Sequence, residues 1–271
     1  MGQGNSIFWF FWFPSSAWEP DHNWRLEIAQ LAPTETQSLP AEPSQGIMRP
    51  MGRIWTWREE DAGAFWDEAR RVLSRHGIIA VPTETFFGLA VNPFQEEALD
   101  RLFALKDRSP GKPVLLLVDG PGMLEQVARE IPVPARRLME KFWPGPLTII
   151  FPSLPHLPRR LTGGAGTIGV RQPRQSLTCR LITALGHPIT GTSANRAGHR
   201  PCVRADEVAR EFGEGVDLIL EAGPCPGGLP STIVDVTNSP ARLVRAGAIS
   251  PAALAEMMPE IEGIPAKGGA R

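Results

Sequence analysis

Several things that this 271-residue chain lacks limit what it can be. Its 28 Lys and Arg residues nearly balance 29 Asp and Glu residues, so a net charge of −1 gives no overall attraction to nucleic acid, although a local basic face stays open. No apolar run reaches 18 residues, so no membrane span is expected. Cys179, Cys202 and Cys225 fit neither a disulfide framework nor a zinc-binding spacing. We therefore expect a cytoplasmic protein with reduced thiols.

The common nucleotide- and metal-binding motifs are also missing. No GK[ST] follows a glycine at the distance that a P-loop requires. Gly164, Gly166 and Gly169 have dinucleotide-fingerprint spacing, but they follow a loop and open a strand rather than a helix. The segment GTSAN at residues 191–195 lacks the last glycine of a nucleophile elbow. The five histidines form no pair at helical spacing, so we expect no tightly bound metal held by protein side chains.

The N-terminal part of the sequence differs from the rest. It contains the aromatic run IFWFFWF, which is too short to span a bilayer. No positively charged residue precedes this run, whereas a signal peptide has one there. A stretch rich in Pro, Ser, Gln and Glu follows, as in linkers. We expect residues 1–50 to be a poorly ordered extension, with translation starting at Met48 or Met51. Residues 51–260 would form one folded domain and residues 261–271 a short tail.

Within the expected domain, helical and strand patterns alternate. Apolar spacing predicts a helix that ends before Gly77 and further helices over 95–106, 123–129, 135–142, 177–185, 203–212 and 251–258. Short β-branched or apolar runs predict strands over 78–81, 147–151, 167–171, 187–190, 216–220, 231–236 and 242–245, with a further strand in the apolar run that ends at Val118. The segments 152–166 and 223–230 are predicted loops, and 191–195 a polar turn. This order indicates an α/β (α+β) fold with a twisted, mixed open sheet flanked by helices.

Short polar and cationic side chains follow the predicted elements. Thr83, Glu84 and Thr85 follow Pro82, which ends the strand at 78–81, and so lie at the carboxyl edge where α/β sheets bind ligands. Lys106, Arg108 and Lys112 fall within seven residues and could clamp an anion, or only stabilise a helix C-terminus. Further members of the set are Arg171, Ser193, Asn195, Ser231 and Arg245. The set contains no strong nucleophile or general base, so it suits binding, positioning and charge neutralisation, as in transfer at phosphorus.

Seven short segments, taken in order, resemble the YrdC family. They are PTETFFGL (82–89), KDR with a following Lys (106–112), FWPGPLT (142–148), TIGVR (167–171), TSAN (192–195), STIVDV (231–236) and VRAGAIS (244–250). The resemblance covers roughly residues 61–258 and is to the short, single-domain type. It departs from the family pattern at Ala246, where a proline is common, and at Leu117, where some members carry histidine.

The resemblance implies a YrdC-like fold and an L-threonylcarbamoyladenylate synthase. This nucleotidyltransferase would make threonylcarbamoyl-AMP and pyrophosphate from L-threonine, bicarbonate and ATP, with Mg²⁺ carried by the ATP. A downstream threonylcarbamoyl transferase complex would then modify tRNA to N6-threonylcarbamoyladenosine. The implied catalytic residues are Lys106, Arg108, Ser193 and Asn195. The implied L-threonine contacts are Thr83, Arg171 and Ser231. The implied ATP contacts are Lys106, Arg108, Lys112, Thr167, Ser193, Asn195 and Arg245.

Two other functions stay open at this point. The same cations could track the phosphate backbone of double-stranded RNA or tRNA in a binding module without catalysis, whose affinity would fall steeply with salt. A related carbamoyl-adenylate-forming enzyme could also use this fold with another substrate, because fold alone does not fix function.

Overall fold

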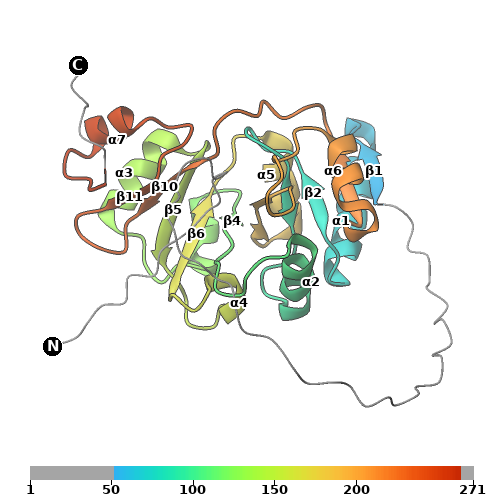
Figure 1. Cartoon of the computed structure of the whole chain (residues 1–271), viewed down its shortest axis with the longest axis horizontal. Coiled ribbons are helices and arrows are strands. Elements are labelled where there is room, and N and C mark those ends of the chain that lie inside the picture. The colour runs from blue at the N-terminus through green and yellow to red at the C-terminus, as the bar shows by residue number, and fades with distance from the viewer. Residues whose placement is uncertain (1–51, 264–271) are drawn as a thin grey trace, which may run out of the picture.

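The computed structural model describes residues 52–263, which form two β-sheets with helices packed around them (Figure 1). The predicted extension, residues 1–50, lies outside the described residues. So do residues 264–271 of the predicted tail. The first tail residues belong to the fold, since Leu243 N donates to Glu262 O at 2.8 Å and Glu262 N donates to Ala241 O at 2.9 Å.

The first sheet has the strand order β1-β9-β2-β3-β8. Its strands are β1 (Arg53–Thr56), β9 (Leu218–Glu221), β2 (Ile79–Val81), β3 (Gly88–Ala90) and β8 (Thr192–Ser193). β9 runs parallel to β1 and β2, whereas β3 runs antiparallel to β2 and β8. All three residues of β2 are buried, as an apolar central strand predicts.

The second sheet has the strand order β11-β10-β5-β6-β4-β7. Its strands are β11 (Arg242–Arg245), β10 (Thr232–Asp235), β5 (Leu147–Pro152), β6 (Thr167–Arg171), β4 (Leu116–Leu117) and β7 (Ile189–Thr190). Parallel and antiparallel pairs alternate across it. The predicted class, with mixed strands flanked by helices, is confirmed, and the strands are divided between two sheets.

The helices cover these sheets through apolar stripes. They are α1 (Ala62–Ser74), α2 (Glu96–Lys106), α3 (Val133–Phe142), α4 (Arg159–Thr162), α5 (Ser176–Leu185), α6 (Ala205–Phe212) and α7 (Pro251–Met257), with short 3₁₀ helices at Glu59–Asp61, Pro121–Gln126 and Gly213–Gly215. α1 packs on β2 and α5, and α6 packs on β9. In α1, Phe65, Ala69 and Leu73 are buried at four-residue spacing, and Gly77 N closes the helix end by donating to Val72 O at 2.8 Å.

The buried stripe of α2 contains a charged residue. Leu99, Leu102 and Phe103 are buried, and Lys106, three and four residues further along the same face, is buried with them. The next residue, Asp107, is left-handed at φ 49° and ends the helix. Lys106 therefore occupies a core position of an amphipathic helix, and its ammonium group must find polar partners inside the protein.

One of the connections between the two sheets is a single residue long. β7 belongs to the second sheet and β8 to the first, and only Gly191 separates them. A Cβ on Gly191 would lie 2.5 Å from Leu117 Cγ, so the close approach of β4 requires glycine here. The preceding residue, Thr190, reinforces the junction, because its hydroxyl accepts from Val91 N at 3.0 Å and donates to Leu89 O at 3.1 Å.

Some predicted elements differ from the observed ones. The predicted loop at 152–166 contains α4, and the predicted turn at 191–195 contains β8. The predicted α-helix at 123–129 is a 3₁₀ helix at Pro121–Gln126, since proline at its start and two glycines nearby favour a short turn. β1 and β3 were not predicted. β1 has four residues and β3 has three, so both are too short to show a periodic pattern.

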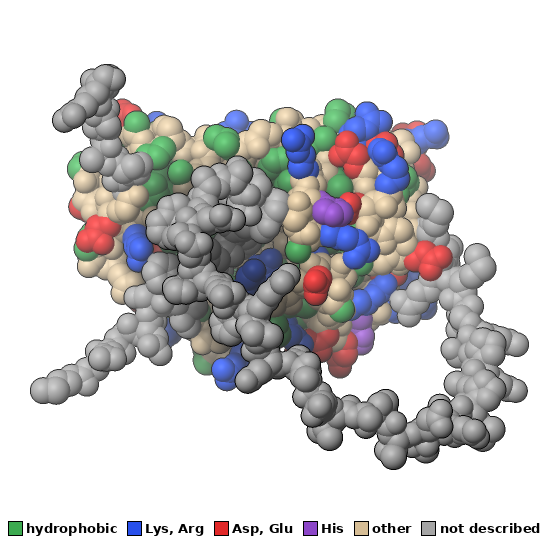
Figure 2. All heavy atoms as spheres, in the orientation of Figure 1, with side chains coloured by type: hydrophobic (Ala, Val, Ile, Leu, Met, Phe, Trp, Pro, Cys, Tyr) green, Lys and Arg blue, Asp and Glu red, His purple; other side chains and the backbone are tan. Residues whose placement is uncertain are grey.

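The surface carries both charge signs. In Figure 2, Lys and Arg side chains are interspersed with Asp and Glu over the part of this face that contains α2 and α6. Within residues 52–263, no helix has the length and apolar character needed to cross a membrane.

Candidate functional site

A pocket of about 370 Å³ opens where the two sheets meet. Thr83 and Gly88 line it from the β2–β3 connection and the start of β3, and Ser193 lines it from β8. From the second sheet, Leu117 of β4 and Arg171 at the end of β6 complete the opposite wall. The pocket therefore lies at a strand-order switch, where α/β proteins commonly bind ligands.

Seven of the ten predicted site residues line this pocket. They are Thr83, Arg108, Arg171, Ser193, Asn195, Ser231 and Arg245. These residues are separated by up to 162 positions in the sequence (245 − 83), yet they converge on one cavity. Lys106, Lys112 and Thr167 are not among the lining residues.

The three exceptions lie in different places. Thr167 begins β6 and Arg171 ends it, so the two lie about 13 Å apart at roughly 3.3 Å per residue, and only Arg171 is among the lining residues. A nucleotide contact by Thr167 stays a prediction. Lys112 is exposed, and its carbonyl oxygen accepts from Arg108 Nε at 3.2 Å. Lys106 reaches the Ser193–Asn195 segment with its Nζ but is not itself a lining residue.

Lys106 binds the backbone of that segment. Its Nζ donates to the carbonyl oxygen of Ser193 and, at 2.7 Å, to that of Asn195. Burial, and then the nearby Arg108 charge, lowers the pKa of Lys106 to about 7. The hydroxyl of Ser193 donates to Asn195 Oδ1 at 2.6 Å, and Asn195 Nδ2 donates to Arg196 O and His199 O. Lys106 thus holds an ordered polar turn at the pocket wall, where it acts on the site through that turn.

Arg108 comes two residues later, on the loop that follows α2. Its Nη2 donates to Pro113 O at 2.6 Å, which fixes the loop, while the side chain also lines the pocket. Burial lowers the pKa of Arg108 to about 10, so the guanidinium stays charged at neutral pH. A charged, partly anchored guanidinium facing a cavity is suited to binding phosphate oxygens.

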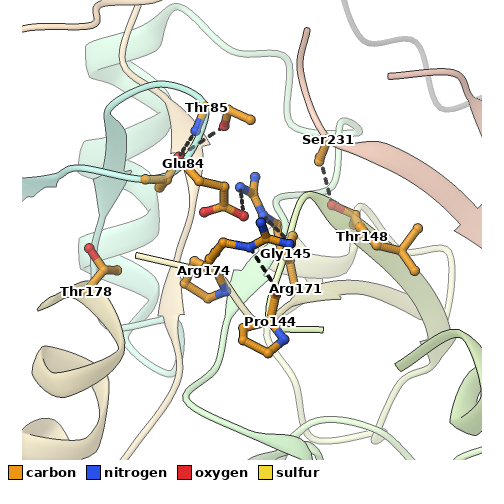
Figure 3. Close-up of polar contacts among 12 residues, drawn as sticks. Glu84, Thr85, Pro144, Gly145, Thr148, Arg171, Arg174, Thr178 and Ser231 are labelled. Carbon is orange, nitrogen blue, oxygen red and sulfur yellow. Dashed lines mark hydrogen bonds and ion pairs between the residues drawn. The ribbon is translucent and has the colours of Figure 1, made fainter. Parts of the chain in front are cut away.

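A second cationic group lies at the ends of the second sheet. Arg245 donates through Nη2 to Ser231 O at 2.7 Å and to Ser231 Oγ at 3.2 Å. The Ser231 hydroxyl is in turn 2.9 Å from Thr148 Oγ1 (Figure 3). Burial, and then the Arg171 charge, lowers the pKa of Arg245 to about 10. Arg171 and Arg245 therefore lie close enough for their charges to interact, and both face the pocket.

Arg171 is paired with Glu84, an acid to which the sequence analysis gave no specific role. Its Nε donates to Gly145 O at 3.2 Å, so the WPGP turn predicted at 143–146 helps hold it. Its Nη2 forms an ion pair with Glu84 Oε1 at 2.6 Å, and Figure 3 shows the Glu84 carboxylate pointing toward this guanidinium. The pair lacks hydrogen-bond alignment, and among the described residues neither Glu84 oxygen has a hydrogen-bond partner. The only sequence signal was that Glu84 lies between two residues of the polar turn at 83–85.

The turn that carries Glu84 is held rigidly. The Thr83 hydroxyl donates to Phe86 O at 2.7 Å and accepts from Thr85 N at 3.2 Å. Thr178 of α5 donates to Pro82 O at 2.6 Å. These bonds fix the backbone of a loop whose side chains line the cavity, so Thr83 shapes this wall as well as facing it.

The rest of the pocket is largely apolar. Phe86, Pro201, Leu229 and Pro230 contribute to its wall, and Leu229 is 63% exposed at the mouth. Sequence reasoning assigned 223–230 only as a Gly/Pro loop and gave these residues no role. Within residues 52–263, no group of three or more His, Cys, Asp or Glu side chains could hold a metal ion.

Comparison with known proteins decides the family. The Sua5/YciO/YrdC family model, described as "Telomere recombination", matches residues 71–247. The chain belongs to this family. Its predicted resemblance to the YrdC family is therefore confirmed, and the match spans β2 through β11, including all the pocket residues named above.

Relatives in the Sua5/YciO/YrdC family share both sequence and fold with the chain. It is 34% identical over 223 residues to the threonylcarbamoyl-AMP synthase of Pyrococcus abyssi, covering 82% of this chain and 64% of that protein. The structure of P. abyssi Sua5 complexed with L-threonine has a TM-score of 0.72 and 32% identity, covering 77% of this chain and 61% of that one. Escherichia coli YciO, at 24% identity and a TM-score of 0.68, supports the fold, covering 75% of this chain and all of YciO. The chain thus spans less than two thirds of the P. abyssi protein.

Proposed function

We propose that this protein is an L-threonylcarbamoyladenylate synthase, which forms threonylcarbamoyl-AMP and pyrophosphate from L-threonine, bicarbonate and ATP. The observation that carries the proposal is the convergence of Arg108, Arg171 and Arg245 on one pocket with the Ser193–Asn195 turn and Ser231. The names of its relatives in the Sua5/YciO/YrdC family support this choice of reaction. We place the product upstream of a threonylcarbamoyl transferase that acts on tRNA, and the reaction in the cytoplasm.

The cationic pocket assists the first step of this reaction. L-threonine carries an ammonium group at neutral pH, and its nitrogen must be neutral before it can combine with bicarbonate to give a carbamate. Nearby positive charges disfavour the ammonium form, so Arg171 and Arg245 lower the pKa of a bound amine. The same guanidinium groups attract the substrate carboxylate, which orients the amine. We assign Arg171, with Thr83 and Ser231, to the amino-acid end of the pocket.

The second step is transfer at phosphorus. A carbamate oxygen attacks the α-phosphorus of ATP, pyrophosphate leaves, and negative charge develops on phosphoryl oxygens. We propose that Arg108 offsets this charge, and that Lys106 keeps the Ser193–Asn195 turn in place against the phosphates. The apolar wall formed by Phe86, Pro201 and Leu229 suits a nucleobase. Mg²⁺ would accompany ATP, bound mainly by phosphates and water as it commonly is, because the pocket lining contains no carboxylate.

Pyrophosphate release tests the proposed function directly. We expect release from ATP and bicarbonate to require L-threonine, with serine as the control amino acid and threonylcarbamoyl-AMP identified by mass spectrometry. ATP turnover that is independent of threonine, or a product without the carbamoyl carbon of labelled bicarbonate, would contradict the proposal.

The position of Lys106 also predicts a pH dependence. Its lowered pKa means that the free protein loses this positive charge as the pH rises through about 7. If the charge is needed to hold the Ser193–Asn195 turn against the ATP phosphates, kcat/KM for ATP at saturating threonine should fall above that pH, because this ratio reports ionisation of the free enzyme. Lys106→Met should lower the plateau and remove that alkaline limb. Persistence of the limb in Lys106→Met would assign it to another group.

A further inference from the structure

Glu84 is a buried acid whose hydrogen-bonding capacity is unused. Its side chain is 15% exposed, both carboxylate oxygens are inaccessible, and neither has a hydrogen-bond partner among the described residues. Its contact with Arg171 Nη2, at 2.6 Å, is an ion pair without hydrogen-bond alignment. Carboxylates removed from water normally accept several hydrogen bonds, since burying them otherwise costs several kcal/mol. A buried carboxylate with unused hydrogen-bond acceptors beside a ligand pocket indicates that a hydrogen-bond donor on the ligand binds it.

The charges around the pocket indicate what that partner is. The charged residues that line it are the cations Arg108, Arg171 and Arg245, and no acid is among the lining residues of the described chain. A zwitterionic amino acid brings a carboxylate that these cations can bind and an ammonium group that they repel. Glu84 is the acid paired with Arg171, so it lies next to the cation that we assign to the substrate carboxylate.

The covalent structure of an amino acid makes the two positions adjacent. Its carboxyl carbon and its nitrogen are bonded to the same carbon, so a group that touches the receptor for one lies within reach of the other. The loop that carries Glu84 is fixed by the Thr83 hydroxyl and by Thr178, so rotation of the Glu84 side chain is enough to change its partner. Glu84 is paired with Arg171 Nη2, at the position where a substrate carboxylate would bind that guanidinium.

We propose that Glu84 binds the ammonium group of the amino-acid substrate, and that the substrate carboxylate replaces it on Arg171. This rests on the proposed function. Glu84 is then placed to accept the proton that the substrate must lose. An N–H bond breaks and an O–H bond forms on the Glu84 carboxyl, and the freed lone pair of the amine forms a bond to the carbon of bicarbonate. The bond between that carbon and the bicarbonate hydroxyl breaks, a second proton from the nitrogen joins the hydroxyl so that it leaves as water, and the product is a carbamate.

Two ligands separate this role from a merely structural one. L-threonine has both charged groups, whereas 3-hydroxybutyrate has the carboxylate and the hydroxyl but no amino group. We expect Glu84→Gln, in the full chain, to weaken calorimetric binding of L-threonine about tenfold or more, because an ionic hydrogen bond contributes about 1.5–3 kcal/mol. Binding of 3-hydroxybutyrate should be unchanged or tighter, because Arg171 is released. Glu84→Asp should recover part of the threonine affinity.

The other outcomes are equally distinct. Equal weakening of both ligands would mean that Glu84 only orients Arg171, and unchanged threonine binding would show that it does not bind the ammonium group; either result overturns the inference while the proposed function stands. Wild-type protein that neither binds threonine nor releases pyrophosphate in response to it would refute the proposed function itself. Asp217→Asn is the matched control, since Asp217 forms a half-buried ion pair with Arg101 at 2.9 Å away from the pocket and should leave both affinities unchanged.

Discussion

Replacing Arg171 by leucine is expected to abolish threonine-dependent pyrophosphate release and to lower the free energy of unfolding by about 3–5 kcal/mol. The guanidinium is 5% exposed and its ion-pair partner, Glu84, is 15% exposed, so removing it leaves a buried carboxylate without its counter-charge. The same change removes the proposed receptor for the substrate carboxylate. Urea unfolding and the pyrophosphate assay measure the two losses separately.

A second substitution distinguishes the structural loss from the functional one. In the Arg171→Leu background, Glu84→Gln removes the uncompensated charge, so the double variant should recover much of the unfolding free energy. It should recover no threonine-dependent activity. A double variant that is no more stable than Arg171→Leu alone would show that the ion pair contributes little, and that the instability comes from lost packing or from the bond to Gly145.

Replacing Arg108 by alanine is expected to lower kcat for pyrophosphate release by about 10²–10³, which is the usual effect of removing one fixed donor aimed at developing charge. Arg108 is half-buried at the pocket wall, and the carbonyl oxygens of Lys112 and Pro113 hold it there. Its effect on kcat should exceed its effect on KM for ATP if the contact strengthens as the phosphoryl charge develops. Steady-state kinetics with ATP as the varied substrate measures both.

Helix α2, which precedes the loop that carries Arg108, supplies a control for this variant. Arg101 donates to His76 O at 3.2 Å and to Asp217 Oδ1 at 3.0 Å, but it does not line the pocket. Arg101→Ala should therefore reduce stability and leave kcat unchanged. Arg108→Lys keeps the charge but loses the planar fork, so it should recover activity only in part. Full activity in Arg108→Ala would remove this residue from the proposed mechanism.

Much of this architecture follows from patterns that a sequence shows directly. Residues 167–171 and 242–245 were predicted as strands with the bounds that the structure has. Short runs of apolar and β-branched residues between loops are typical of strands. Short polar and cationic residues at the ends of predicted elements predicted seven residues of the pocket. Even the burial of Lys106 has a sequence signal, since it continues the apolar stripe of Leu99, Leu102 and Phe103.

Other features depend on tertiary contacts that no local pattern contains. The pairing of Glu84 with Arg171 joins residues 87 positions apart (171 − 84), and nothing in either segment selects the other. β8 has two residues and lies in a segment predicted as a turn, so periodicity cannot identify it, and the division into two sheets stays hidden.

The one-residue junction at Gly191 has a consequence for anyone who would re-engineer this protein. Gly191 alone connects β7 to β8, which belong to the two sheets that form opposite walls of the cavity. The Thr190 side chain fixes this connection through its hydrogen bonds with Leu89 O and Val91 N. Neither layer can be excised, circularly permuted near this point, or lengthened by a single amino acid without moving Ser193 relative to Arg171. A design that builds this cavity into another protein would therefore have to include both sheets together with the Gly191 junction.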